Sequence, residues 1–226
     1  MNNDVTLYGA SDAPLISRRT YNALCFGLVT ASFLVMYLMY GLAAAGVLDG
    51  LLAPGAGGIV TLVVALVGTI GGILLMGSGK KSQSVGVSLA GYLLFSLTFG
   101  LTIALALEHY TGQTISSAFG ITACLAGIFL IAGVTFPDFF ASIGHLLFLS
   151  LIALIAAEIV GTLVFHANQT VFDYIAILVF CGFIGYDSYQ LAADDPTVPN
   201  AIWHACDIYV DIANVLIRVL DLLDNR

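Results

Sequence analysis

Long apolar runs alternate with short polar segments along most of the chain. The runs lie at 21–45, 59–76, 86–107, 115–134, 143–165 and 171–192. Each is about 20 residues long, the length that an α-helix needs to cross a hydrocarbon core of roughly 30 Å. This pattern predicts six membrane-spanning helices before the last stretch of the chain.

The last stretch, Ala201 to Leu223, is apolar on most faces but carries polar residues at helical spacing. They follow one another at steps of three or four residues: His204, Asp207, Asp211, Asn214, Arg218 and Asp221. That spacing places them on one stripe of an α-helix. In a chain this apolar, we interpret the stripe as facing the interior of a helical bundle. We expect a seventh crossing; a half-inserted last helix is the alternative.

Composition supports a membrane protein. Hydrophobic residues make up 60% of the chain and charged residues 9%, with a mean hydropathy of +1.03, which lies outside the range of soluble domains. A net charge of -8 argues against a nucleic-acid partner. The four cysteines stand singly in apolar runs, so the spacing indicates neither a disulfide framework nor a zinc site. The predicted fold class is an all-α integral membrane protein.

Basic residues and breaks organise the predicted bundle. We expect residues 1–20 to form an N-terminal tail and residues 21–226 a single seven-helix transmembrane domain. Arg18 and Arg19 fall on the same side as Lys80 and Lys81 if the first two spans cross, so the positive-inside rule predicts a cytoplasmic N-terminus. Short loops and the lack of a soluble domain suggest a bacterial plasma membrane or an organellar membrane.

Breaks between the runs predict the connections. Turns are expected at Asp49–Gly58, at Gly77–Gln83 with its two lysines, and at His166–Thr170. Phe136–Asp138 is expected to break the chain before the fifth span. Asp194–Pro196 has the pattern of a helix start, because an aspartate carboxylate caps free N–H groups and proline tolerates the first turn.

Ionisable residues within the spans are the main functional signal, because each costs at least a few kcal/mol to insert. They are Glu158, Asp187, Asp207, Asp211 and Arg218, with His204 near a helix end. Asp187 and Asp211 enter the last two helices from the same side, so we expect their carboxyl groups to lie close together and to share a proton.

Two such carboxylates suit a pH sensor, and when both are charged they suit a calcium ion whose remaining ligands are water. We expect no other cofactor. A structural latch is the alternative reading. In it Asp207 or Asp211 pairs with Arg218, through another helix or water because seven residues separate Arg218 from Asp211.

Three segments resemble the Bax inhibitor family, also called the transmembrane Bax inhibitor motif family. They are Phe180–Leu191, which contains Gly185-Tyr186-Asp187; Ile208–Asn214, which contains Asp211-x-x-Asn214; and Thr135–Gly144, which resembles the loop before the family's fifth span. The chain resembles a bacterial-type member. The resemblance implies seven helices with the last one central and surrounded by the other six. It also implies that Asp187 and Asp211 are the paired aspartates that respond to pH in members that leak calcium.

Three function classes follow. The first is a pH-sensitive calcium leak or channel with Asp187 and Asp211 as sensor and ion ligands, and with Asp207, Arg218 and Glu158 as candidate modulators. The second is a non-transporting regulator that binds other membrane proteins, such as a protease or a cell-death factor. The third, remote class is an intramembrane aspartyl protease, but the residues before Asp211 lack the glycines of such enzymes, so we expect no enzyme activity. The partners expected are the lipid bilayer and calcium or protons.

Overall fold

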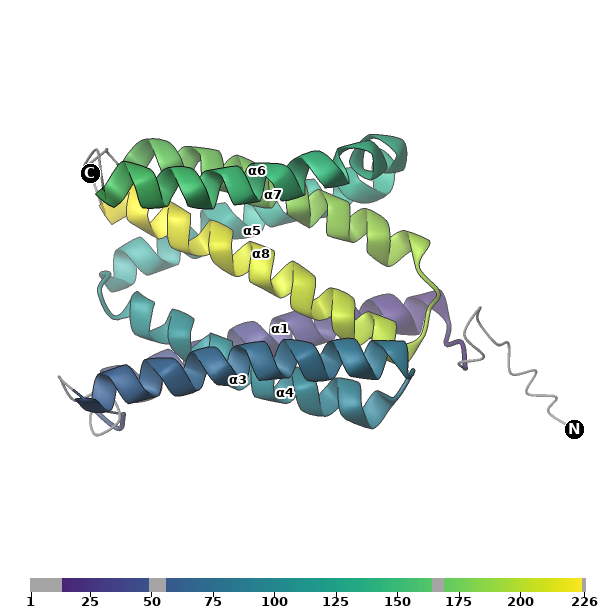
Figure 1. Ribbon diagram of the computed structural model, residues 1–226, viewed down its shortest axis with the longest axis horizontal. Coiled ribbons are helices and arrows are strands. Elements are labelled where there is room, and N and C mark those ends of the chain that lie inside the picture. Colours follow the sequence, from purple (N-terminus) through teal and green to yellow (C-terminus); the bar gives the residue numbers. More distant parts are fainter. Residues whose placement is uncertain (1–13, 49–55, 164–168, 225–226) are drawn as a thin grey trace, which may run out of the picture. The chain divides into compact units, whose positions relative to one another are not determined.

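The computed structural model describes residues 14–48, 56–163 and 169–224, and its secondary structure is helical (Figure 1). The helices of these residues are α1 (Arg18–Ala44), α3 (Ala56–Lys81), α4 (Val85–Leu107), α5 (Gly112–Thr135), α6 (Pro137–Leu163), α7 (Gln169–Ala193) and α8 (Val198–Asp224). Within these ranges, six helices are long and apolar enough to cross a membrane, and α8, which carries the polar stripe, is not among them. The predicted all-α membrane fold is confirmed, whereas a seventh crossing stays a prediction.

Two expected breaks are shorter than predicted, because only residues 82–84 separate α3 from α4 and only Phe136 separates α5 from α6. α3 continues to Lys81, so both lysines end a helix, where their charge is favourable beside the free carbonyl groups, and the loop predicted from Gly77 is wrong. α6 begins at Pro137 directly after α5, because proline lacks only an N–H that the first helical turn would leave unpaired.

The start of α8 also differs from the expected pattern. The backbone N–H of Asn200 donates to Oγ1 of Thr197 at 3.3 Å, so a threonine and not an aspartate caps this helix. Two further expected turns, Asp49–Gly58 and His166–Thr170, are helical where the structure describes them, because α3 begins at Ala56 and α7 begins at Gln169. Asp49–Gly55 and residues 166–168 lie outside the described residues.

One compact unit comprises α1, α3, α4 and α8 as far as Asp207. In it α4 packs against both α3 and α1, and Figure 1 shows α3 and α4 side by side. The Ser32 hydroxyl of α1 lies 2.7 Å from the Tyr92 hydroxyl and 2.6 Å from the Ser96 hydroxyl of α4. Buried hydroxyl pairs of this kind hold membrane helices together where lipid offers no hydrogen-bond partner.

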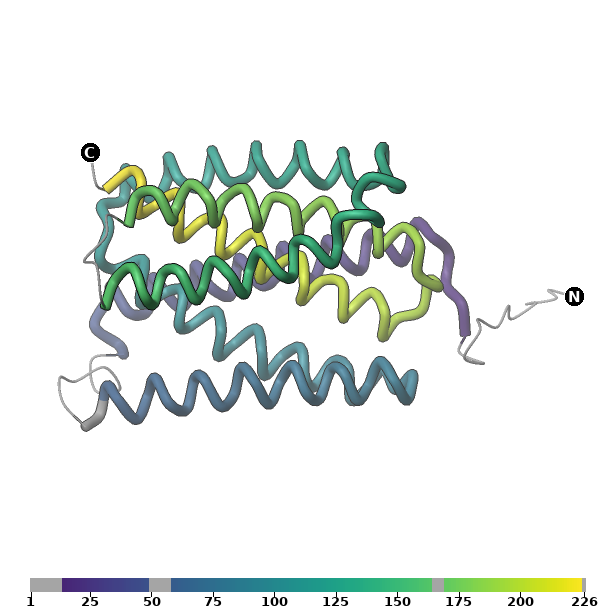
Figure 2. The backbone as a smooth tube through the Cα atoms, turned by 45° about the horizontal axis from the view of Figure 1, so that its top comes forward, coloured from purple at the N-terminus to yellow at the C-terminus, as the bar shows by residue number. Residues whose placement is uncertain are grey.

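The second compact unit comprises α5, α6, α7 and α8 from Ile208, and Figure 2 shows α5, α6 and α7 as long helices with roughly aligned axes. α7 contacts both of the others. A Cβ atom at Gly133 of α5 would collide with the Gly185 carbonyl oxygen of α7, and one at Gly144 of α6 would collide with the Tyr186 ring. Small residues at these positions allow the close backbone approach typical of membrane helices.

α8 is the helix with the least exposure. Of its residues Val198–Asp224, only Asp224 is exposed. His204 and Asp211 are buried, and Asp207, Asn214 and Arg218 are half-buried. The polar stripe therefore faces the protein interior, as the spacing predicts. The extent of residues 21–226 as a single domain stays a prediction.

We predict that Gly133→Ala destabilises the second unit, because the new methyl group meets backbone of α7. Overpacking of this kind costs about 1–3 kcal/mol, so thermal unfolding in detergent should begin several degrees below that of the unaltered protein. Gly127→Ala is the matched control in α5, because a Cβ atom there meets nothing within 4 Å. Equal melting temperatures for the two variants would contradict the close approach of α5 and α7.

Candidate functional site

Asp187 of α7 and Asp211 of α8 lie together in the second unit. Their relative exposures are 8% and 7%, and their side chains are hydrogen-bonded to each other. A bond between two carboxyl groups requires that one of them carries a proton, because an ionised carboxylate only accepts. The structure thus brings together the two residues that the sequence singles out.

Neighbouring contacts fix the position of Asp187. The hydroxyl of Ser188 donates to the carbonyl oxygen of Leu130 in α5 at 2.7 Å. On the preceding side, the Tyr186 ring packs over Gly144 of α6. The segments 135–144 and 180–191, which carry the family resemblance, therefore pack against each other. The residues directly before and after Asp187 are both held by contacts to neighbouring helices. The first of these segments is helical from Pro137 onward, so the expectation of a loop there is wrong.

The other motif residue of α8 has a local role. The side-chain amide of Asn214 donates to the carbonyl oxygen of Val210 at 2.9 Å, within its own helix. Asp207 is half-buried one helical turn before Asp211. Asp211 is thus the residue of α8 to which the side chain of Asp187 is hydrogen-bonded.

The aspartate pair has the chemistry of a proton-dependent charge. With one shared proton it carries a single negative charge, and with none it carries two that repel each other at hydrogen-bonding distance. Among the residues described, no group of three or more histidine, cysteine or acidic side chains converges as a metal site would require. A calcium ion at this position would therefore need water for most of its ligands.

Arg218 pairs with acids of two neighbouring helices, and a latch with Asp207 or Asp211 stays a prediction. Its guanidinium nitrogens lie 2.8 Å from Glu158 of α6 and 3.0 Å from Asp173 of α7. The side chain of Asp173 is only 2% exposed. Arg218 thus joins α8 to two neighbouring helices, and Glu158 acts as its counter-ion.

Asp173 is one of the contact residues that the sequence does not single out. It lies only four residues after the start of α7 at Gln169 and so resembles an interfacial residue in the sequence. The available signal was its position fourteen residues before Asp187, roughly 21 Å along the same helix at 1.5 Å per residue. α7 therefore offers α8 two acidic contacts at well-separated depths.

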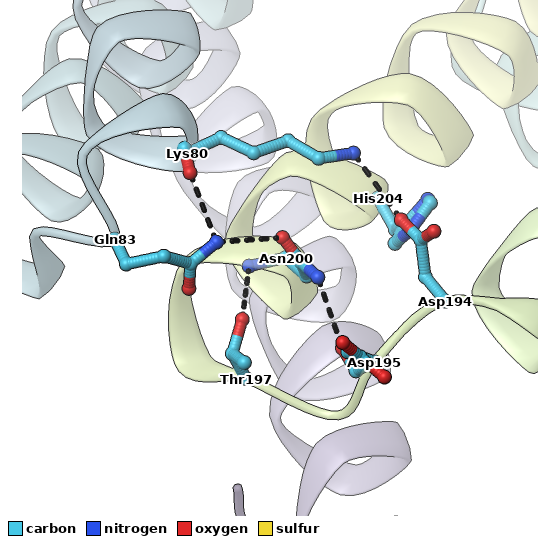
Figure 3. A network of polar contacts seen from close by, with 7 residues as sticks. All are labelled: Lys80, Gln83, Asp194, Asp195, Thr197, Asn200 and His204. Atoms are coloured by element: carbon cyan, nitrogen blue, oxygen red, sulfur yellow. Dashed lines mark hydrogen bonds and ion pairs between the residues drawn. The ribbon is translucent and has the colours of Figure 1, made fainter. Parts of the chain in front are cut away.

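A third charged contact lies in the first unit, near the start of α8 (Figure 3). Nε2 of His204 lies 2.9 Å from Oδ2 of Asp194, and Nζ of Lys80 lies 3.3 Å from the same oxygen. Asn200 accepts from the Gln83 amide at 3.4 Å and donates to the Asp195 carbonyl oxygen at 3.0 Å. These contacts tie the end of α3 to the beginning of α8.

Asp194 lies between helices, and its hydrogen bond from His204 and the charge of Lys80 lower its pKa from 3.8 to about 2. A group with a lowered pKa contributes stability at pH values above its usual pKa, and that contribution is lost as the pH falls toward the lowered value. The contacts of Asp194 therefore hold the start of α8 throughout the physiological pH range. The contacts of Asp194 are therefore not a pH-sensitive element in that range.

Comparisons with known proteins place these residues in a family context. A model of the family described as "Inhibitor of apoptosis-promoting Bax1" matches residues 14–226. The chain is 26% identical over 225 residues to the inner membrane protein YbhL of Escherichia coli (strain K12), covering 94% of each chain. It is 26% identical over 213 residues to the Golgi anti-apoptotic protein of Vaccinia virus (strain Lister), covering 92% of this chain and 84% of that protein.

A third relative is Bax inhibitor 1 of Schizosaccharomyces pombe. The chain is 28% identical to it over 159 residues, which cover 67% of this chain and 57% of that protein. The similarity to YbhL and to the viral protein thus extends over nearly all of the chain. The family match at residues 14–226 includes both α7 and α8, which carry the paired aspartates.

We predict that Arg218→Gln destabilises the protein, because it leaves Glu158 and Asp173 without a counter-charge in a buried setting. Removing one partner of a buried ion pair costs on the order of 3 kcal/mol, which should appear as a lower melting temperature in detergent. Asp224→Asn is the matched control, because this residue is exposed on the same helix.

The double variant Arg218→Gln/Glu158→Gln separates charge from packing. It removes one of the two stranded acids, so part of the lost stability should return. If Arg218→Gln unfolds at the same temperature as Asp224→Asn, the ion pairs do not hold α8.

Proposed function

Since this chain belongs to the Bax inhibitor family, we propose that it is a pH-sensitive calcium leak whose sensor is the Asp187–Asp211 pair. The chain is a multi-pass membrane protein, and we propose the bacterial plasma membrane as its location. The observation that carries the proposal is a hydrogen bond between two buried acidic side chains. The interaction between two such side chains changes from attraction to repulsion when the shared proton leaves.

The proposed mechanism has two states, which differ by one proton on the aspartate pair. With the proton in place, the hydrogen bond joins α7 to α8. Without it, two negative charges about 4 Å apart repel by roughly 4 kcal/mol at an effective dielectric constant of 20. That is enough to shift a two-state helix contact by about three orders of magnitude. The same double charge attracts a divalent cation. Loss of the proton therefore weakens the contact between α7 and α8 and favours the binding of calcium. We therefore propose that flux rises with pH.

Asp207 and the Arg218 cluster fit this scheme as modulators. Asp207 places a further acid one turn from Asp211 and increases the negative field that an entering cation meets. Arg218 and Glu158 connect α8 to α6. We propose that this ion pair resists displacement of the C-terminal half of α8 when the aspartates repel.

A non-transporting regulator is the alternative, and the relatives' names favour it. Two proteins that this chain resembles are named as an anti-apoptotic protein and a Bax inhibitor. A regulator of this class would bind other membrane proteins, such as a protease or a cell-death factor. It would keep that binding after both aspartates are neutralised, and it would carry no ion flux in pure bilayers.

Calcium flux into liposomes tests the proposal. Purified protein would be reconstituted with a calcium-sensitive dye inside, and influx measured from about pH 5 to about pH 8, the range in which perturbed carboxyl groups titrate. We expect flux to rise several-fold with pH in the unaltered protein and to become independent of pH in Asp211→Asn, because an amide cannot lose the proton.

Asp224→Asn serves as the control, since it removes one acid from the exposed end of α8 and should leave the pH profile unchanged. Flux that is identical in the unaltered protein and in Asp211→Asn at every pH would end this proposal. No flux at all, with partner binding intact in the doubly neutralised variant, would favour the regulator.

A further inference from the structure

We propose that the first unit binds an anionic phospholipid in a hollow between the end of α3 and the start of α8. The hollow has a volume of about 650 Å³ and is lined by Ile73, Leu74, Gly77, Ser78, Lys81, Ser82 and Trp203. This volume is in the range of small-molecule sites. The proposal is independent of the calcium leak, because none of these residues belongs to the aspartate pair.

The lining changes from apolar to polar along α3. Ile73 and Leu74 lie at one end, with relative exposures of 36% and 68%, and Lys81 lies at the other. From Leu74 to Lys81 the helix rises roughly 10 Å. The polar end coincides with the end of the apolar span, where lipid headgroups meet the protein. A phospholipid is arranged in the same way, with a charged headgroup at one end and apolar chains at the other.

Lys81 is the cation available to a headgroup. Its neighbour Lys80 is engaged by Asp194 at 3.3 Å and lies over the Trp203 ring at 5.5 Å from the centroid. Lys81 is exposed and has no ion-pair partner within the described ranges. Ser78 stands beside it and supplies a hydroxyl group, which donates readily to phosphate oxygens, whereas the hydroxyl of Ser82 already donates to the carbonyl oxygen of Ser78 at 2.9 Å.

Trp203 forms the wall on the α8 side. Its ring lies against Gly77 of α3, where a Cβ atom would lie 3.4 Å from it, at ordinary contact distance. Tryptophan is enriched at membrane interfaces because its ring is apolar and its N–H is polar. The hollow thus combines an interfacial aromatic, a lysine and an apolar groove, the features of basic lipid sites at the ends of membrane helices.

Charge favours an anionic lipid over a zwitterionic one. The chain as a whole has a net charge of -8 and only six lysines and arginines, so its general field repels anionic headgroups. Any preference for such a lipid must therefore come from a local cation. Lys81 lies on the side that the positive-inside rule assigns to the cytoplasm, and we take phosphatidylglycerol as the representative ligand.

The chain contains a single tryptophan, Trp203, so its fluorescence reports directly on the hollow. The protein would be placed in phosphatidylcholine vesicles containing a small fraction of lipid brominated on the acyl chains, either phosphatidylglycerol or phosphatidylcholine. We expect brominated phosphatidylglycerol to quench the fluorescence of Trp203 about five times as strongly as the same fraction of brominated phosphatidylcholine. One lysine near an anionic headgroup contributes a preference of this size.

Lys81→Gln should reduce this preference to about one, and Lys81→Arg should retain it. Arg19→Gln is the matched control, because it removes an exposed basic residue of the same unit that does not line the hollow. Equal quenching by the two lipids in the unaltered protein would overturn the proposal. So would a preference that survives Lys81→Gln but is lost in Arg19→Gln, because it would then arise from general surface charge.

Discussion

The structure depends on pairing the polar groups of one buried helix. α8 carries several ionisable residues although only Asp224 among its residues is exposed, and each unpaired charge in such a setting would cost several kcal/mol. The cost is met by short contacts to other segments at successive levels: His204 with Asp194, Asp211 with Asp187, Arg218 with Glu158 and Asp173, and Asp221 with Tyr110. These contacts are the reason that a striped helix stays inside an apolar protein.

One of these contacts differs from the rest in its charges. His204 and Arg218 meet acids, and the Tyr110 hydroxyl donates to Asp221 at 2.5 Å, so each of these contacts is attractive with its ordinary protonation states. The contact between Asp187 and Asp211 joins two acids and is attractive only while a proton lies between them. A change of pH therefore acts first on this pair, which is why we assign it the sensor role.

The positions of the other contacts along α8 explain how the protein can accommodate a pair of acids that repel each other without their proton. On one side, Asp194 holds the start of α8 to α3 through His204 and Lys80, with a lowered pKa that keeps it charged. On the other side, Arg218 holds the later part of the helix to α6 and α7. The acid pair lies between these two contacts along α8. The helix is thereby fixed near both ends, and its middle carries the contact that depends on pH.

Much of this arrangement can be read from the sequence, because it depends on spacing. Apolar runs of membrane length predict the helices, and steps of three and four residues predict the stripe on α8. The closeness of Asp187 and Asp211 follows from their depth in consecutive helices. The partners of Arg218 could not be predicted, because Glu158 lies on a helix whose rotation no spacing rule defines. Asp173 and Lys80 were missed because both lie near helix ends, where helix and loop residues look alike.

The most direct test of the central claim is the pH dependence of thermal unfolding in the unaltered protein, in Asp187→Asn, in Asp211→Asn and in the doubly substituted protein. If one proton is shared, either single substitution replaces the acid pair by an amide and a carboxylate, so the pH dependence that belongs to the pair should disappear equally in all three variants. Pairing would be contradicted if each single variant kept part of that dependence and the two parts added up to the whole, because the aspartates would then titrate independently.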